Sequence, residues 1–216
     1  MIDDRLIAEA RKTLFSFDRD GALQIVQAIM SEGGNPLELM DKAFIPGITE
    51  IGEKFSTGEM FLPELIQAAE VMKSVTQLIS DFLPKGEGEM LQKGAVVIGT
   101  VQGDIHDIGK TLVVTLLGVH GFKVYDLGRD VAVETFVAKA KEVDADIVGS
   151  SALLTTTMTK QKELESALQE AGLKGRIKTI VGGAPVTQRW AERIGADAYG
   201  EDAHDAVQKV KALLNL

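Results

Sequence analysis

One segment of the sequence, residues 95–109, constrains the fold more than any other. Its first seven residues are apolar or small, with valine and isoleucine prominent, which is typical of a buried strand. The glycine-rich residues 102–109 then predict a sharp turn that opens a helix. Doubly wound α/β folds place their ligand-binding groups at the carboxyl ends of parallel strands. The side chains of this turn are therefore candidate site residues.

The same strand-then-helix pattern repeats to the end of the sequence. Strands are expected at residues 95–101, 123–127, 147–151, 179–182 and 198–199. Helices are expected at residues 108–120, 133–143, 158–171, 187–194 and 203–214. This alternation predicts an α/β domain at residues 91–216, built on a doubly wound, parallel five-stranded sheet.

The residues before this region show only helical periodicity. Apolar spacing and capping signals predict four helices within residues 1–83, joined by short connections as in a four-helix bundle. Asp18 and Asn35 are candidate N-caps, and the Pro46 and Gly47 pair predicts a kink or a break in the third helix. Residues 84–90 hold a proline, two glycines and several charges, which indicates a linker between two domains.

Composition excludes several kinds of function. The 216 residues carry a net charge of −9 without a run of lysine or arginine, so we expect no nucleic acid partner. Cysteine is absent, which excludes disulfides, thiolate metal sites and cysteine nucleophiles. The first residues have no long apolar core, and no apolar run approaches the ~18 residues that span a bilayer. A cytoplasmic protein without a membrane partner is expected.

Three turns at the expected carboxyl edge of the sheet hold unusual residues. The first contains Asp104, His106 and Gly109, and a histidine paired with a nearby carboxylate can bind a metal while the carboxylate fixes its tautomer. The second, residues 150–157, has five hydroxyl side chains, and the third has Gly182 and Gly183. Taken singly, the hydroxyls also suit a helix entry and the glycines an ordinary turn.

The spacing of these turns resembles a known family. Asp104-x-His106-x-x-Gly109 is followed after 41 residues by Ser151-x-Leu153, and after a further 28 residues by Gly182 and Gly183. This pattern closely resembles the cobalamin-binding domain of cobalamin-dependent methionine synthase and of the corrinoid subunits of methyltransferase systems. Residues 55–64 resemble the junction of the helical cap in the same proteins. The resemblance covers nearly the whole chain and implies a helical cap domain followed by a Rossmann-like cofactor domain.

The resemblance implies a role for each residue of the motif. His106 would bind cobalt in place of the cofactor's own lower base, the base-off/His-on state. Asp104 would accept the other ring N–H of His106, and Thr157, which stands where methionine synthase has serine, would continue this proton relay. Ser151 and Thr155 would bond the nucleotide tail. The other implied cofactor-binding residues are Gly103, Ile105, Asp107, Ile108 and Gly109 in the first turn, Leu153, Gly182 and Gly183 along the slot for the tail, and Phe55 and Leu62 in the cap.

The implied function is that of a methyl carrier without a complete turnover of its own. Cobalt(I) of a cobalamin or related corrinoid would accept a methyl group from a donor, with a methylated amine or betaine preferred over methanol, through a partner methyltransferase. The methylcobalamin state would then pass the group to a second methyltransferase for a thiol or tetrahydrofolate acceptor. A reductive activase is a further implied partner, and the linker at 84–90 is the expected hinge.

Two other functions stay open for such a sequence. The cobalamin-binding subunit of an adenosylcobalamin mutase shares the lower-face motif, but the Phe55–Leu62 cap segment argues against it. A cobalamin-sensing regulator would need a DNA-binding module, and the acidic helical half has no basic recognition helix.

Overall fold

The structure is a computed structural model that describes residues 2–83 and 92–216. The chain divides into two compact units, residues 1–93 with 118–121, and residues 94–117 with 122–216. The linker expected at 84–90 lies outside the described residues. None of the described helices is both long enough and apolar enough to cross a membrane.

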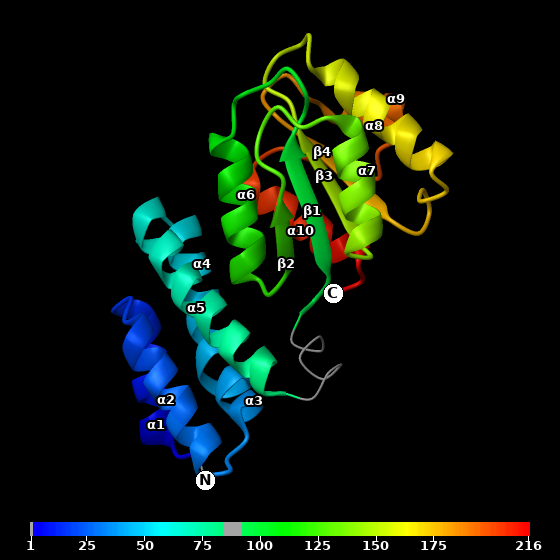
Figure 1. Ribbon diagram of the computed structural model, residues 1–216. Coiled ribbons are helices and arrows are strands. Elements are labelled where there is room, and N and C mark those ends of the chain that lie inside the picture. The colour runs from blue at the N-terminus through cyan, green and yellow to red at the C-terminus, as the bar shows by residue number, and fades with distance from the viewer. Residues whose placement is uncertain (1, 84–91) are drawn as a thin grey trace. The chain divides into compact units, whose positions relative to one another are not determined.

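The first unit is helical, as predicted. It contains α1 (Asp4–Phe15), α2 (Arg19–Ser31), α3 (Pro36–Leu39), the π-helical turn η1 (Met40–Phe44), α4 (Ile45–Ser56) and α5 (Leu62–Phe82) (Figure 1). The side chains of Asp18 and Asn35 cap α2 and α3 as expected, by accepting hydrogen bonds from backbone N–H groups. The core of the unit includes Leu14, Phe44 and Ile51, each fully buried.

The third predicted helix is continuous through α3, η1 and α4, and its interruption takes the form of the π-helical turn. Ile45 N–H donates to the carbonyl of Met40, five residues earlier. Pro46 follows at the start of α4, and proline has no N–H for the ordinary bond to the fourth residue before it. The π-helical turn η1 therefore ends just before Pro46, where one α-helical hydrogen bond is missing in any case.

The second unit is a doubly wound parallel sheet, also as predicted. Its strands are β1 (Ala95–Thr100), β2 (Lys123–Asp126), β3 (Ile147–Ser151), β4 (Lys178–Gly182) and β5 (Ala198–Gly200), in the order β2-β1-β3-β4-β5 with every pair parallel. The helices are α6 (Ile108–Val119), α7 (Val133–Glu142), α8 (Met158–Glu170), α9 (Gln188–Ile194) and α10 (Ala203–Leu213).

The two faces of the sheet differ in what covers them. On one face, Val97 and Val148 pack with Phe136 of α7 and with Leu164 of α8 in one buried cluster. Figure 1 shows α10 on the opposite side of the sheet from α7 and α8. On that opposite face, the aligned residues Ile98, Gly149 and Ile180 line a cavity. The sheet therefore has one densely packed face and one that is partly open.

Candidate functional site

The strand register brings the three predicted turns together. Thr100 of β1 pairs with Ser151 of β3, and Ser151 pairs with Gly182 of β4, so the three strands end side by side. The turns that follow them start from one edge of the sheet. Residues that are about 80 positions apart in the sequence thus become neighbours, as the motif requires.

The Asp104 carboxylate accepts five hydrogen bonds at this edge of the sheet. It is fully buried, and its Oδ1 accepts hydrogen bonds from the backbone N (3.1 Å) and Nδ1 (2.8 Å) of His106. Its Oδ2 accepts from the backbone N of Leu153 (2.7 Å), the backbone N of Leu154 (3.2 Å) and Oγ1 of Thr157 (2.7 Å). One carboxylate therefore joins the turn after β1 to the turn after β3.

These donors also set the protonation of Asp104. Burial alone would raise the pKa of this carboxyl, because it removes the charged form from water. The hydrogen bonds from Thr157, from His106 and from the backbone of Leu153 outweigh that effect and hold the pKa well below its ordinary value. Asp104 is thus a charged acceptor, and Nδ1 of His106 carries the proton that lies between them.

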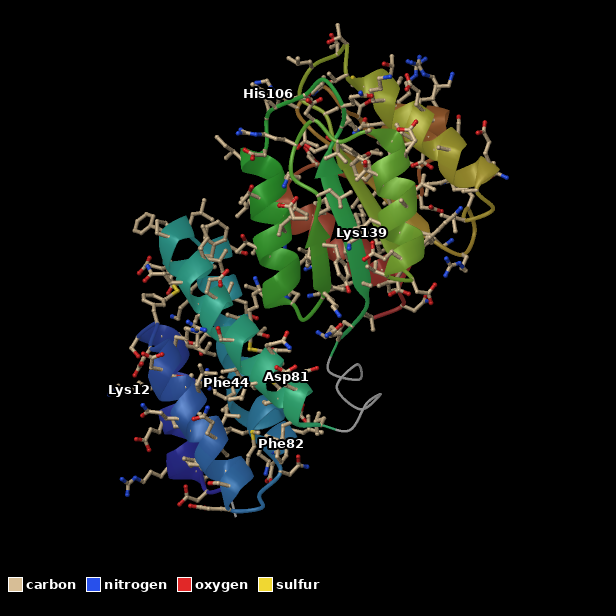
Figure 2. All side chains as sticks on the ribbon, viewed as in Figure 1. Lys12, Phe44, Asp81, Phe82, His106 and Lys139 are labelled. Carbon is tan, nitrogen blue, oxygen red and sulfur yellow. The ribbon has the colours of Figure 1, made fainter. Side chains whose placement is uncertain are left out.

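His106 has one ring nitrogen held and the other available. With Nδ1 directed at Asp104, Nε2 is the nitrogen that remains for a metal, and the side chain is 46% exposed. Figure 2 shows His106 beyond the carboxyl end of the sheet, in the loop that leads from β1 to α6. Within residues 2–83 and 92–216, no group of three or more His, Asp or Glu side chains could hold a metal ion. His106 therefore suits a metal whose other ligands come from a cofactor.

A cavity of about 550 Å³ opens beside His106. It runs between the open face of the sheet and helices α6 and α10, where Val113 and Ala206 contribute to its wall. Of the predicted cofactor-binding residues, it is lined by Ile105, His106, Asp107, Ile108, Gly109, Ser151, Leu153, Gly182 and Gly183. We refer to this cavity as the slot.

Two positions of the motif, 183 and 109, hold glycine in different surroundings. At Gly183 the backbone has φ +121°, and a Cβ would lie 1.9 Å from the carbonyl oxygen of Ala152, so the protein itself excludes a side chain there. At Gly109 a Cβ would meet nothing within 4 Å, although glycine in a helix costs stability. The packing of the unit therefore does not require glycine at position 109, and the space beside it is open.

Four large apolar side chains near His106 are exposed. Ile105, Ile108, Leu153 and Leu154 are 65%, 84%, 40% and 42% exposed, and we call these four residues the apolar rim. Large apolar side chains gathered in this way around a polar group mark a surface that binds something. The rim and the slot together offer an exposed apolar surface and a cavity beside one histidine.

The remaining predicted residues lie elsewhere. Gly103 has its N–H bound to the Asp130 carboxylate, 2.7 Å away, and supports the turn from outside the slot. Thr155 is exposed and does not line the slot. Phe55 at the end of α4 and Leu62 at the start of α5 belong to the helical unit, where both are half-buried.

The structure adds residues that the sequence motif did not indicate. Thr100 is fully buried, and its Oγ1 donates to the carbonyl oxygen of His106 at 3.0 Å. Lys110 lines the slot with its side chain only 1% exposed, and its Nζ lies 2.5 and 2.6 Å from the two carboxylate oxygens of Asp126. Gln161 of α8 is fully buried behind the ends of β3 and β4.

Comparison with protein families matches both units. Residues 94–208 match a B12 binding domain, and residues 6–79 match a second model that is also described as a B12 binding domain. The first match contains the whole of the site described above.

Individual proteins are similar over nearly their whole length. The chain is 49% identical to the trimethylamine corrinoid protein of Methanosarcina barkeri, covering 99% of this chain and 98% of that one. It is 44% identical to the dimethylamine corrinoid protein of the same organism, covering 99% and 100%. Its structure matches one chain of the methanol:cobalamin methyltransferase complex from Methanosarcina barkeri with a TM-score of 0.87 and 32% identity, covering 99% and 81%. The slot, the histidine beside it and these relatives together place the chain in the B12-binding family of corrinoid proteins.

Proposed function

We propose that this chain is a corrinoid-dependent methyl carrier of a methyltransferase system. The observation that carries the proposal is His106, held through Nδ1 by the charged Asp104 at the mouth of the slot. The family membership and the names of the relatives support the same function.

The residues present fit a corrinoid. A lone histidine is a poor site for a free metal ion, but a corrin ring already supplies four nitrogens to cobalt and lacks only axial ligands. Nε2 of His106 would be one axial ligand, and the apolar rim would contact the ring around it. The slot would take the nucleotide tail, with Gly109 open beside it.

Within this proposal the chain's own residues have distinct tasks. Asp104 holds the proton on Nδ1 of His106 and so fixes the tautomer whose Nε2 can bind a metal. Thr157 donates to Asp104 and completes the relay proposed from the motif. Ser151, which lines the slot, would bond the nucleotide tail there, and the exposed Thr155 would be a second partner for the tail. Phe55 and Leu62 are proposed to shield the upper face of the cofactor.

The bound corrinoid would supply the cobalt that holds the methyl group between donor and acceptor. We propose a methylated amine as the donor, because the curated relatives are named for trimethylamine and dimethylamine. A substrate-specific methyltransferase is the proposed partner, since one similar solved structure is a methanol:cobalamin methyltransferase complex. A second methyltransferase for a thiol or tetrahydrofolate, a reductive activase, a cytoplasmic location and the domain bounds 1–83 and 91–216 remain predictions of the sequence.

The absorbance spectrum of the protein mixed with cobalamin tests the lower-ligand assignment. We expect the wild-type chain to take up cobalamin with the spectrum of a histidine-ligated, base-off corrinoid. His106→Ala should lose that spectrum, and Asp104→Asn should bind about 10- to 100-fold more weakly, as when a partner of a ligating histidine is removed. His120→Ala is the control, since His120 does not line the slot. A failure of the wild type to bind, or an unchanged spectrum in His106→Ala, would overturn the assignment.

Methyl transfer itself is tested with the loaded protein, its cobalt first brought to cobalt(I) with a chemical reductant, and a candidate methyltransferase. We expect trimethylamine or dimethylamine, rather than methanol, to methylate the bound corrinoid, as measured by mass spectrometry. Methylation from methanol alone would contradict the proposed donor class and leave the carrier function in place.

A further inference from the structure

Gln161 is a polar residue on the apolar face of a helix. It lies in the first turn of α8, three and seven residues before Leu164 and Leu168, which pack in the core on the same face. Its exposed fraction is 0%, whereas glutamine is mostly found at the surface. A buried amide is stable only if its polar atoms have partners, and those partners show what the residue does.

The amide of Gln161 bonds to three separate elements. Its Nε2 donates to the carbonyl oxygen of Ser150 (3.0 Å) in β3 and to that of Gly182 (3.2 Å) in β4. Its Oε1 accepts from Nε1 of Trp190 (3.0 Å) in α9. An indole N–H can only donate and a backbone carbonyl can only accept, so these partners permit only one orientation of the amide.

These bonds are made at the wall of the slot. Ser150 and Gly182 both line it, as the penultimate residue of β3 and the last residue of β4, close to where the pairing of the two strands ends. Beyond them the two turns continue to Leu153 and Gly183, which also line the slot. One backbone bond, from Ala152 N to the Gly182 carbonyl (3.1 Å), joins the turns at this point, and Gln161 adds a second tie to the same carbonyl.

We propose that Gln161 is a positioning residue that sets the separation of the β3 and β4 ends and thereby makes the chain select corrinoids that carry a nucleotide tail. This rests on the proposed corrinoid function and deepens it. Gln161 itself does not line the slot and would act through the carbonyls of Ser150 and Gly182. Without the amide, the ends of β3 and β4 would be held less firmly at the wall of the slot, while the hydrogen bond from His106 to Asp104 would remain.

The test compares two corrinoids, cobalamin and cobinamide, which has the same ring but ends before the nucleotide. Dissociation constants for both are measured by absorbance titration of the wild type and Gln161→Met, a variant of similar shape without hydrogen bonds. We expect Gln161→Met to bind cobalamin about ten-fold more weakly, or about 1.4 kcal/mol, with cobinamide binding unchanged. Gln169→Leu, an exposed glutamine of the same helix, should leave both constants unchanged.

The ratio of the two constants separates positioning from general damage. A merely structural role would weaken both corrinoids equally, and an unchanged ratio in Gln161→Met would overturn the proposal. If Gln161→Met does not fold, Trp190→Phe removes the donor to Oε1 while keeping an aromatic ring in the cluster around Val181, and it should shift the ratio in the same direction by a smaller factor. An unchanged ratio there overturns the proposal too. A wild-type chain that binds neither corrinoid would instead refute the proposed function.

Discussion

Asp104 and Glu165 are both buried carboxylates of the doubly wound unit, but they belong to opposite ends of its sheet. Asp104 lies after the carboxyl end of β1, where five donors from the turns converge on it. Glu165, in the middle of α8, joins a cluster at the amino ends of β4 and β5. The first end contains the slot, and the second is closed by polar side chains.

The closed end uses its charges to join loops to strands. Lys174 makes an ion pair with Oε2 of Glu165 and donates to Oγ1 of Thr179 at 2.9 Å. Asp197 accepts from the backbone N of Thr179 at 2.8 Å. Apart from this ion pair, Oε2 of Glu165 has no hydrogen-bond partner among the described residues. Burial therefore dominates and raises the pKa of Glu165, even though Lys174 opposes the shift.

The two carboxylates differ in how far hydrogen-bond donors offset the cost of burial. Both side chains are buried, yet the pKa of Asp104 is lowered because five donors meet its carboxylate, whereas burial raises the pKa of Glu165. Beside the slot, the charged Asp104 accepts a hydrogen bond from Nδ1 of His106 and leaves Nε2 available to a ligand. At the other end, the charge of Glu165 costs stability.

The largest effect is expected for Asp104→Asn. The amide would turn its NH₂ group toward one of two sets of N–H and O–H donors and leave that set without an acceptor. We expect the free energy of unfolding to fall by about 3 kcal/mol, measured by urea unfolding followed by circular dichroism. A loss as small as that of an exposed carboxylate variant such as Glu170→Gln would show that the donors do not depend on the charge.

Acid titration should separate the two carboxylates by pH. The stability that Asp104 contributes is complete above the ordinary aspartate pKa of about 3.9 and is lost only as pH falls toward its lowered folded value. The difference in the free energy of unfolding between the wild type and Asp104→Asn should therefore become smaller only below about pH 4. For Glu165 the folded pKa is raised, so its cost is relieved as pH falls toward its ordinary value of about 4.3, at a higher pH than the Asp104 change. If the stability changes due to Asp104 and to Glu165 occurred over the same pH range, the proposed difference between the two carboxylates would be wrong.

A smaller effect, of opposite sign, is expected for Glu165→Gln. The neutral amide removes a poorly solvated charge, while Lys174 keeps Thr179 and Asp197 as partners. The free energy of unfolding at neutral pH should rise by about 0.5–1 kcal/mol. Glu170→Gln on the exposed side of the same helix is the matched control. A loss of stability would mean that the ion pair with Lys174 outweighs the burial of Glu165.

The smallest change in stability is expected for Gly109→Ala. The added Cβ meets nothing within 4 Å and alanine is the better helix former, so stability should rise by about 0.5 kcal/mol at this second residue of α6. Cobalamin affinity should fall, because the slot narrows. Gly118→Ala is the control, since Gly118 lies in the same helix with equal free space but outside the slot. Equal cobalamin binding in the two variants would show that Gly109 does not face the ligand.

Much of the fold could be predicted, because its elements carry local signals. Asp18 and Asn35 cap helices at the expected positions, and the apolar strand residues such as Val97 and Val148 are buried as their pattern indicates. Asp104 and His106 could be found because the motif lies within a few residues. Their five-donor arrangement could not, since Leu153 and Leu154 contribute backbone groups that carry no side-chain signal.

The residues that sequence reasoning missed depend on partners far along the chain. Lys110 is rarely a buried residue type, and its partner Asp126 is 16 residues away on another element. Thr100 is an ordinary strand residue until its hydroxyl is seen to bond the backbone of His106. Gln161 alone gave a signal, because a glutamine on the same helical face as Leu164 and Leu168 interrupts an apolar stripe.

Trp190 gives this chain a label of its own. It is the single tryptophan of the sequence, so all indole emission comes from one known place. That place is one hydrogen bond from Gln161 and two from the carbonyls of Ser150 and Gly182 in the wall of the slot. The filling and emptying of the slot can therefore be followed in time by intrinsic fluorescence, without any added dye.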